Sequence, residues 1–239
     1  MKSIIYRLVV GAWQGLRFVA AQAAALLRRC CVEPLWGIVL ALQTRAVEGV
    51  IAEKIRVLRC AGHAVKVHLG CGTDYKDGWI NIDVHGAKLD LAWDLRKRLP
   101  FPEGSVDRIY SEHFLEHLTV EEASTVLRGC RAALAVDGAM RISVPDLRAW
   151  VGFYLDPDWR KNCDLEKWQL SHIATRAELL NAGVRWWGHQ WMYDAEELRR
   201  RLTEAGFSDI KECAFCKSDS PDLCGLESRE NSVIMEARR

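Results

Sequence analysis

Two glycines and an aspartate in the stretch VHLGCGTDYKDGWINIDV are the first residues with a recognisable chemical use. Gly70 and Gly72 follow an apolar run, and Asp83 ends a second apolar run eleven residues after Gly72. Glycines let the backbone turn sharply and approach a ligand without a Cβ in the way. An acid at the end of a second strand accepts hydrogen bonds from ribose hydroxyls. The group therefore predicts a nucleoside site.

The same stretch disfavours a dinucleotide. A dinucleotide turn has the pattern G-x-G-x-x-G and opens a helix that receives the pyrophosphate. This sequence lacks a third glycine at the required place, and the short spacing between Gly72 and Asp83 hardly accommodates a crossover helix. We therefore expect a nucleoside cofactor without phosphates, and we give less weight to a nucleotide-dependent oxidoreductase.

Chemically useful residues recur at the ends of the strands that the sequence predicts. The strand-like runs are residues 65–70, 79–84, 88–95, 106–113 and 138–146. In open parallel sheets, ligands bind beyond the carboxyl ends of the strands. The residues at those ends are Gly70 to Thr73, Asp83, Asp94, Leu95, Ser111, Glu112, His113 and Asp146.

Helical segments alternate with these strands. Residues 121–135 are predicted as one helix, and residues 194–206 as another with an N-cap at Asp194 and a stop at Gly206. Residues 207–215 and 231–238 would close the sheet as a terminal strand pair. This alternation predicts an α/β fold around a mostly parallel sheet.

With these motifs the chain resembles the class I S-adenosylmethionine-dependent methyltransferases. More narrowly, it resembles small methyltransferases found among bacterial polysaccharide and glycosyltransferase genes. The resembling stretches are VHLGCGTDYKDGWINIDV, DLRKRLPFPEGSVDRIYSEHFLEHL, GAMRISVPDL, GHQWMYDAEELRRRLTEAGF and SPDLCGLESRENSVIMEARR. The resemblance runs from about Val65 to the C-terminus. It implies a Rossmann-like sheet with an antiparallel terminal strand, in a methyltransferase domain over residues 61–239.

The resemblance also implies roles for individual residues. The methionine part of the cofactor would be lined by Leu69, Gly70, Cys71 and Gly72. The nucleoside would be held by Asp83 at the ribose, Val84 and Leu95 at the adenine ring, and Asp94 at the adenine amino group. The reactive sulfonium would be flanked by Ser111, Glu112 and His113. The chain departs from the wider pattern at His68, where many class I enzymes carry an acid, and in the missing third glycine.

His113 is the predicted catalytic base. Methyl transfer from a sulfonium is an in-line displacement, so alignment of the two reactants can supply much of the catalysis. A hydroxyl acceptor must also lose its proton, and histidine is suited to that role near neutral pH. His113 follows the fourth predicted strand, whereas His117 lies one helical turn further and suits capping or packing better.

The segment RWWGHQWMYD concentrates tryptophans, a histidine and a tyrosine. One interpretation is an aromatic cluster that packs the end of the sheet. The other is a lid over the acceptor, because tryptophan faces suit sugar rings and His189 or Tyr193 could orient a hydroxyl. We predict a substrate-side role for Trp187 and Tyr193, and a catalytic role for His189. Asp146 either contacts the substrate or caps the following helix.

Composition excludes some function classes. Thirty-three basic and thirty-two acidic residues give a net charge of +1, which provides no global reason to bind nucleic acid. Nine irregularly spaced cysteines make a disulfide framework unlikely and fit a reducing, cytoplasmic compartment. The pair in CAFC, Cys213 and Cys216, lacks the second pair or nearby histidine of a zinc site. We expect no metal site.

Residues 1–60 are predicted as an amphipathic helical extension. Their uncharged runs are shorter than the roughly 20 residues that span a bilayer, and arginines interrupt any signal-peptide core. Residues 1–30 read as a basic amphipathic helix. Such a helix can lie in the membrane interface at the inner face, or it can pack on the domain or a partner.

We therefore expect a methyltransferase that uses S-adenosylmethionine and acts on a hydroxyl of a saccharide, glycolipid or related small molecule. The alternative is a non-catalytic binding or scaffold protein that kept the fold. The two differ in whether the sulfonium side of the cofactor opens into a pocket for an acceptor.

Overall fold

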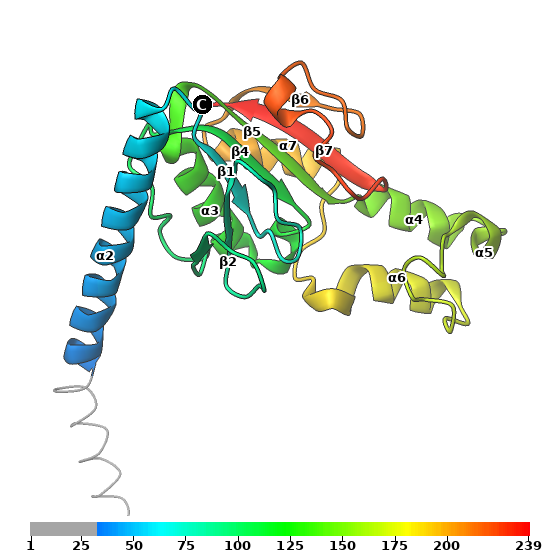
Figure 1. The fold of residues 1–239 in the computed structure, drawn as a ribbon. Coiled ribbons are helices and arrows are strands. Elements are labelled where there is room, and N and C mark those ends of the chain that lie inside the picture. Colours follow the sequence, from blue (N-terminus) through cyan, green and yellow to red (C-terminus); the bar gives the residue numbers. More distant parts are fainter. Residues whose placement is uncertain (1–32) are drawn as a thin grey trace, which may run out of the picture. The chain divides into compact units, whose positions relative to one another are not determined.

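The computed structural model describes residues 33–239, with side chains from residue 44 onward. These residues form a seven-stranded sheet in the order β3-β2-β1-β4-β5-β7-β6 (Figure 1). Neighbouring strands from β3 to β5 pair in parallel, and β7 runs antiparallel to both β5 and β6. The predicted α/β sheet is confirmed. The strands are β1 (Lys66–Leu69), β2 (Ile80–Asp83), β3 (Leu91–Ala92), β4 (Val106–Glu112), β5 (Leu134–Pro145), β6 (Ser208–Glu212) and β7 (Ser232–Arg238).

Two amphipathic helices pack against each other and help to cover the sheet. They are α3 (Val120–Ala133) and α7 (Ala195–Glu204). In α3 the buried side chains recur at helical spacing, as in Ala123, Val126, Leu127 and Cys130. Asp194 caps α7 by accepting a hydrogen bond from the Glu197 amide, as the sequence predicted.

The boundaries of α3 and β5 differ from the prediction. Thr119 and Glu122 form a capping box, so the helix begins at Val120. It ends at Ala133 because Leu134 already pairs with Val106 at the start of a twelve-residue β5. The strand was predicted to begin only at residue 138, since Asp137 and Gly138 resemble a turn.

A helical insertion between β5 and α7 carries a second apolar cluster. It contains α4 (Leu147–Leu155), α5 (Trp159–Asn162) and α6 (Arg176–Arg185). The α4 and α6 helices lie side by side beyond the ends of β5 and β7 (Figure 1). A Cβ at Gly183 would lie 2.4 Å from the Trp150 ring, so glycine permits this close approach. Leu170, Ile173 and Leu179 complete the buried centre.

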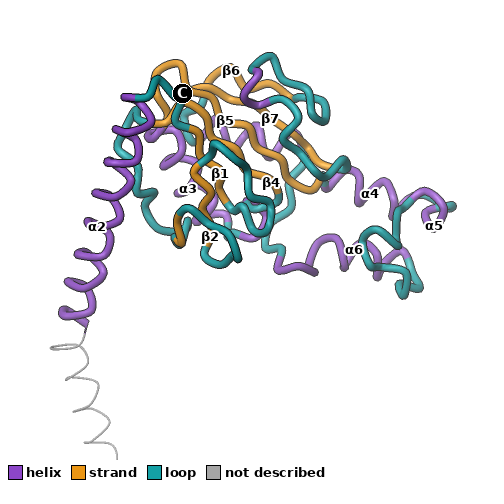
Figure 2. The backbone as a smooth tube through the Cα atoms, viewed as in Figure 1, coloured by secondary structure: helices purple, strands orange, loops and turns teal. Residues whose placement is uncertain are grey.

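Arg141 fixes the long loop between β6 and β7, drawn mainly in teal in Figure 2. Its side chain is fully buried and pairs with Glu227 and with Glu236, the latter at 2.6 Å. It also donates to the carbonyl oxygens of Ala214 and Lys217. A buried guanidinium needs such partners, because an unpaired buried charge is costly. The contacts hold in place the loop that contributes Arg229 and leads into Ser232, the first residue of β7.

The remaining short helices are 3₁₀ turns: η2 (Leu115–His117), η3 (Trp186–Gly188) and η4 (Pro221–Leu223). The thiols near η4 hydrogen-bond to backbone: Cys216 Sγ to Glu227 O and Cys224 Sγ to Cys216 O.

Helix α2 (Glu33–Cys60) contains the boundary between two compact units, which falls between Ile51 and Ala52. The predicted division at residue 60 stays a prediction. The amphipathic helix predicted for residues 1–30 lies outside the described residues. None of the helices in residues 33–239 combines the length and the apolar character that a membrane span needs.

Candidate active site

A cavity of about 650 Å³ lies at the carboxyl ends of β1, β2 and β4. Most of the predicted cofactor residues line it: Gly70, Cys71, Gly72, Asp83, Val84, Asp94, Leu95 and Glu112, together with His113. The structure does not bring Leu69 and Ser111 to the lining. Both are strand residues with only 1 % of their surface exposed, so their side chains lie within the layers around the sheet.

The glycine turn is built for close approach. Gly70 has φ +65°, and a Cβ there would lie 2.6 Å from the Phe114 side chain. The amides of Gly70 and Cys71 both donate to Ile82 O, at 2.9 and 3.2 Å, which ties the turn to the end of β2. A side chain at position 70 would therefore displace Phe114 and require an unfavourable backbone conformation.

Asp83 connects this turn to the end of β2. Its Oδ2 accepts from the Gly72 amide at 2.9 Å, and its Oδ1 accepts from the Val84 amide at 2.6 Å. The Oδ1 atom also accepts from the His85 amide at 3.3 Å. A carboxylate oxygen has two lone pairs, so Oδ2 can accept a further hydrogen bond from a ligand in the cavity. Val84 is half exposed and offers an apolar surface beside it.

The far side of the cavity is formed by Asp94 and Leu95. Asp94 accepts two hydrogen bonds from the Arg96 guanidinium, at 2.9 and 3.0 Å. These bonds hold the pKa of the Asp94 carboxyl below its ordinary value. Leu95 is buried, with 4 % of its surface exposed. Asp94 therefore presents an ionised acceptor, partly occupied by Arg96.

His68 lines the cavity where many class I methyltransferases carry an acid. It is buried, and its Nδ1 lies 3.2 Å from Asn81 Oδ1. Burial, assisted by the positive charge of Lys76, lowers the pKa of His68 to about 4. The ring is therefore neutral at physiological pH and cannot replace the negative charge of an acid.

Glu112 positions a loop in addition to lining the cavity. Its carboxylate accepts hydrogen bonds from the amides of Ser228 and Arg229, at 2.9 and 3.0 Å, and from Ser228 Oγ at 2.8 Å. It also forms an ion pair with the Arg229 guanidinium at 3.6 Å. Arg229 lines the cavity as well, and no sequence motif pointed to it.

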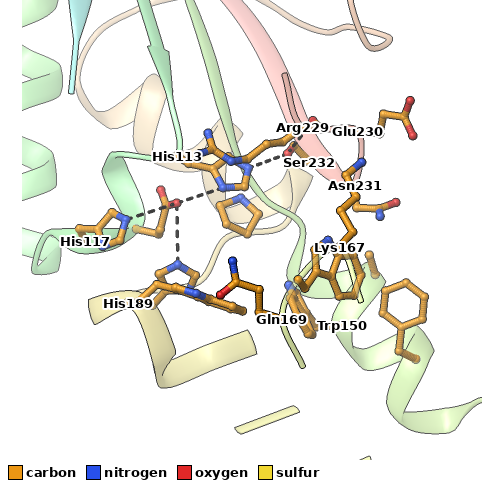
Figure 3. A pocket seen from close by; sticks show the side chains of 16 residues that line it. His113, His117, Trp150, Lys167, Gln169, His189, Arg229, Glu230, Asn231 and Ser232 are labelled. Atoms are coloured by element: carbon orange, nitrogen blue, oxygen red, sulfur yellow. Dashed lines mark hydrogen bonds and ion pairs between the residues drawn. The ribbon is translucent and has the colours of Figure 1, made fainter. Parts of the chain in front are cut away.

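A second cavity of about 600 Å³ adjoins the first. The two share His113, His117 and Arg229 in their linings. The second cavity is lined by aromatic residues from the helical insertion and by polar residues from the loops around it (Figure 3). The aromatic residues are Trp150, Phe153, Trp168 and Trp187; the polar ones include Lys167, Gln169, Glu230 and Asn231.

His113 stands at the junction of the two cavities in a left-handed backbone conformation, with φ +51°. Such a conformation is uncommon for a residue other than glycine and is often found at functional sites. Its Nε2 lies 2.8 Å from Ser232 Oγ, and its Nδ1 faces Glu116 Oε1 at 3.6 Å (Figure 3). Burial, followed by the charge of Arg229, lowers the pKa of His113 to about 3, so the ring is neutral.

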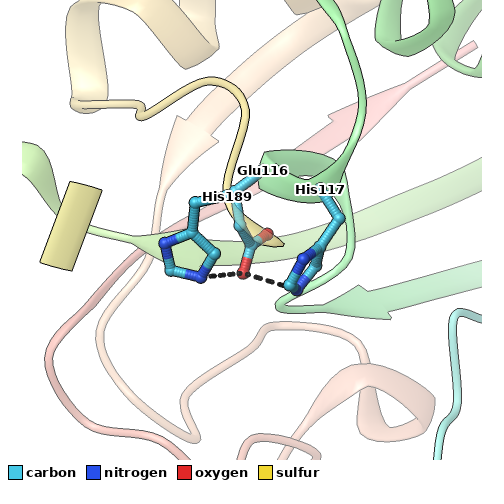
Figure 4. Close-up of side chains that lie close together, drawn as sticks. All are labelled: Glu116, His117 and His189. Atoms are coloured by element: carbon cyan, nitrogen blue, oxygen red, sulfur yellow. Dashed lines mark ion pairs between the residues drawn. The ribbon is translucent and has the colours of Figure 1, made fainter. Parts of the chain in front are cut away.

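Glu116, His117 and His189 lie together (Figure 4), and Glu116 Oε1 is 3.6 Å from His113 Nδ1. Glu116 is fully buried, and burial raises the pKa of its carboxyl to about 8. His189 comes from the segment after η3, and its Nδ1 lies 2.8 Å from Gly183 O. Burial lowers the pKa of both His117 and His189.

Of the residues predicted on the substrate side, some line a cavity and others do not. Trp187 and His189 line the second cavity. Asp146 is the N-cap of α4, where its side chain accepts from the Arg148 amide. Tyr193 is buried, with 1 % of its surface exposed, and its backbone pairs with Asp146. Neither Asp146 nor Tyr193 is among the residues that line the two cavities.

A sequence model of the methyltransferase domain family matches residues 71–142. This range contains Gly72, Asp83, Asp94 and His113, and it ends before His189. No curated protein matches the chain.

Solved structures of methyltransferases are among those that this chain is similar to. A SAM-dependent methyltransferase from Archaeoglobus fulgidus is 18% identical over 82% of this chain and 94% of its own, with a TM-score of 0.48. A methyltransferase from Thermotoga maritima, described as a possible histamine N-methyltransferase, is 14% identical over 84% and 95%, with a TM-score of 0.46. A methyltransferase from Mesorhizobium loti is 19% identical over 73% and 90%, with a TM-score of 0.42.

The methyltransferase-domain match over residues 71–142, the strand order and the lining of the first cavity together support a methyltransferase that uses S-adenosylmethionine. The protein is thus an enzyme, and its cofactor is S-adenosylmethionine. The residues present fit this cofactor, because the backbone at Gly72 has open space beside it and Asp83 Oδ2 keeps acceptor capacity for a ribose hydroxyl.

Proposed function

We propose that the enzyme methylates a hydroxyl of a saccharide, a glycolipid or a related small molecule. The observation that carries this proposal is the junction of the two cavities at His113, His117 and Arg229. One cavity suits the cofactor and the other suits the acceptor, so the reacting groups would meet at the shared residues. A plugged acceptor side would instead have favoured a non-catalytic scaffold.

The lining of the second cavity supports a polyhydroxylated acceptor. Trp150, Trp168 and Trp187 offer flat apolar faces, against which the C–H faces of a sugar ring can pack. Gln169 and Asn231 offer both hydrogen-bond donors and acceptors. This suits hydroxyl groups, because each hydroxyl both donates and accepts hydrogen bonds. Pockets that combine apolar walls with a few placed polar groups are typical of small-molecule sites.

His113 is the proposed base. Ser232 Oγ donates to Arg229 O, so it accepts from His113 Nε2–H and leaves Nδ1 without a hydrogen. When bound, S-adenosylmethionine would supply a methyl group on its sulfonium; the S–C bond would break as an acceptor oxygen bonds to that carbon, and S-adenosylhomocysteine would leave. As the new O–C bond forms, the hydroxyl proton passes to His113 Nδ1. The tautomer imposed by Ser232 therefore presents the nitrogen that can accept this proton.

An acceptor search tests the proposed function. Extracts of source cells that lack the gene would be incubated with purified enzyme and S-adenosylmethionine carrying a deuterated methyl group. We expect a saccharide or glycolipid to gain one labelled methyl on oxygen, seen by mass spectrometry and located by NMR. Label on nitrogen or carbon, or label confined to protein or nucleic acid, would contradict the proposed acceptor class.

Trp187→Ala should raise the KM for the acceptor by about 10-fold or more while leaving S-adenosylhomocysteine affinity unchanged. Loss of one aromatic contact removes about 0.5–1.5 kcal/mol beyond the buried area, and about 1.4 kcal/mol corresponds to a factor of ten. Trp191→Ala is the matched control, because Trp191 is 40% exposed and its Nε1 donates to Glu197. Equal KM changes in both variants would remove Trp187 from the acceptor site.

A further inference from the structure

The Glu116 carboxylate is buried without a hydrogen-bond partner. None of its surface is exposed, and neither Oε1 nor Oε2 has a partner among the described residues. Burying a carboxylate without compensation costs several kcal/mol or more, so native proteins pair such groups or bind a metal with them. Glu116 lines the second cavity next to His113 and His117, which both cavities share, so its lack of a partner needs an explanation.

Imidazole nitrogens surround this carboxylate. His117 Nε2 lies 3.9 Å from Glu116 Oε1, and His189 Nε2 lies 4.0 Å from the same oxygen (Figure 4). These distances exceed the range of a hydrogen bond, which ends near 3.2 Å for N–H···O. The side chains therefore converge on one point without bonding one another.

Hydrogen bonds on the far side of the rings set the direction of the lone pairs. His189 Nδ1 donates to Gly183 O at 2.8 Å, because a carbonyl can only accept. A neutral His189 then has its bare Nε2 turned toward Glu116. His113 behaves similarly, since Nε2–H donates to Ser232 and the bare Nδ1 faces Glu116. Lone pairs of nitrogen and oxygen thus point at one another across the gap.

A positive ion in the gap satisfies this arrangement better than a proton does. A proton on Glu116 would make one short hydrogen bond and leave the other nitrogens facing an empty gap. A metal ion with bonds of about 2.0–2.1 Å holds its ligand atoms about 3.4 Å apart in a tetrahedral site. The ligand atoms of Glu116, His117 and His189 all lie within 4.8 Å of one another, so modest side-chain rotations bring them to that spacing.

We propose that Glu116, His117 and His189 bind a divalent transition-metal ion, with Zn²⁺ as the reference case. Two imidazoles and one carboxylate form a ligand set that suits Zn²⁺ and its neighbours in the first transition row. Three protein ligands leave a coordination position open, as in catalytic zinc sites. His189 Nδ1–H···O=C Gly183 is the outer contact that commonly orients a ligating histidine.

The charges around the site are compatible with a cation. Arg229 is the nearest positive group in the lining of both cavities. The Arg229 guanidinium forms an ion pair with Glu112 at 3.6 Å, and this ion pair offsets part of the repulsion between Arg229 and a bound cation. A bound dication and the Glu116 carboxylate would leave one net positive charge at the junction.

The open position faces the residues that the two cavities share. If the proposed function holds, an acceptor oxygen bound there would have a lowered pKa, and His113 would take its proton. That use of the metal rests on the proposed function, whereas metal binding itself does not. The two can therefore be tested separately.

Metal binding is measured on the tag-free full chain after treatment with a chelator. Zn²⁺ titration by calorimetry should show one saturable site, and the bound zinc should measure one equivalent per chain. Glu116→Gln and His189→Gln should each weaken that site by more than about 100-fold, beyond the loss that an outer contact produces. Glu103→Gln and His63→Gln are matched controls at exposed positions and should bind as the wild type does.

Cobalt distinguishes this site from the cysteines. Co²⁺ in place of Zn²⁺ should give visible bands without a thiolate charge-transfer band, and Glu116→Gln should lose these bands. A thiolate band, an unsaturable titration, or equal binding by wild type and by Glu116→Gln would overturn the proposal. Circular dichroism of each metal-free variant confirms the fold, so loss of binding is not mistaken for unfolding. Metal binding with no acceptor methylation would uphold this site and refute only the proposed function.

Discussion

Replacing His113 with alanine should lower the rate of methyl transfer by about 10²-fold, the lower end of the range that a positioned general base contributes, because burial keeps this ring a weak base. The affinity for S-adenosylhomocysteine should change little, because Asp83, the proposed polar anchor of the cofactor, is untouched. The reason lies in the geometry: His113 lines both cavities, and its Ser232 partner leaves Nδ1 without a hydrogen.

The measurement pairs single-turnover kinetics with calorimetric titration of S-adenosylhomocysteine. His172→Ala serves as the control, since His172 is exposed and stacks on Trp186 with ring centroids 5.5 Å apart. A parallel loss of rate and of cofactor affinity in His113→Ala would make His113 a cofactor residue. An unchanged rate would remove it from the proton transfer.

Asp83→Ala should weaken binding of S-adenosylhomocysteine by at least about 100-fold. Hydrogen bonds to a charged group contribute about 1.5–3 kcal/mol each, and the variant would lose the one that Asp83 Oδ2 can accept from the ribose. The variant also loses the acceptor for the Gly72 and Val84 amides, so the glycine turn becomes less well anchored. Both effects act in the same direction.

Calorimetric titration of wild type and variant measures this loss. Asp77→Ala is the matched control, because the Asp77 side chain is 96% exposed and does not line the cavity. Thermal unfolding without ligand shows whether the fold survives each change. Wild-type affinity in Asp83→Ala would mean that the cofactor lies elsewhere.

The cofactor half of the site was largely predictable from sequence. Gly70, Gly72, Asp83 and Asp94 each follow a recognisable strand, and a parallel sheet gathers the carboxyl ends of its strands at one edge. The hydrophobic periodicity and the turn residues therefore indicated where each strand ends, and so which residues lie at the same edge of the sheet. The capping box at Thr119 and Glu122 was also readable, and it would have corrected the start of α3.

The acceptor half was less predictable, because loops far apart in sequence build it. Arg229 reaches the junction only because buried Arg141 and Glu112 fix the loop that carries it. The helical insertion separates His189 from Glu116 in the sequence. Local sequence patterns therefore do not indicate that the two side chains lie close together. Tyr193 looked like a substrate residue because it lies in an aromatic segment, but it is buried with 1 % of its surface exposed.

A crystal structure with S-adenosylhomocysteine would show where the cofactor binds. We expect the ligand in the cavity at the ends of β1, β2 and β4, with its ribose on Asp83. Its sulfur should lie at the end that His113 shares with the second cavity. A ligand bound outside this cavity, or with its sulfur turned away from the second cavity, would contradict the account.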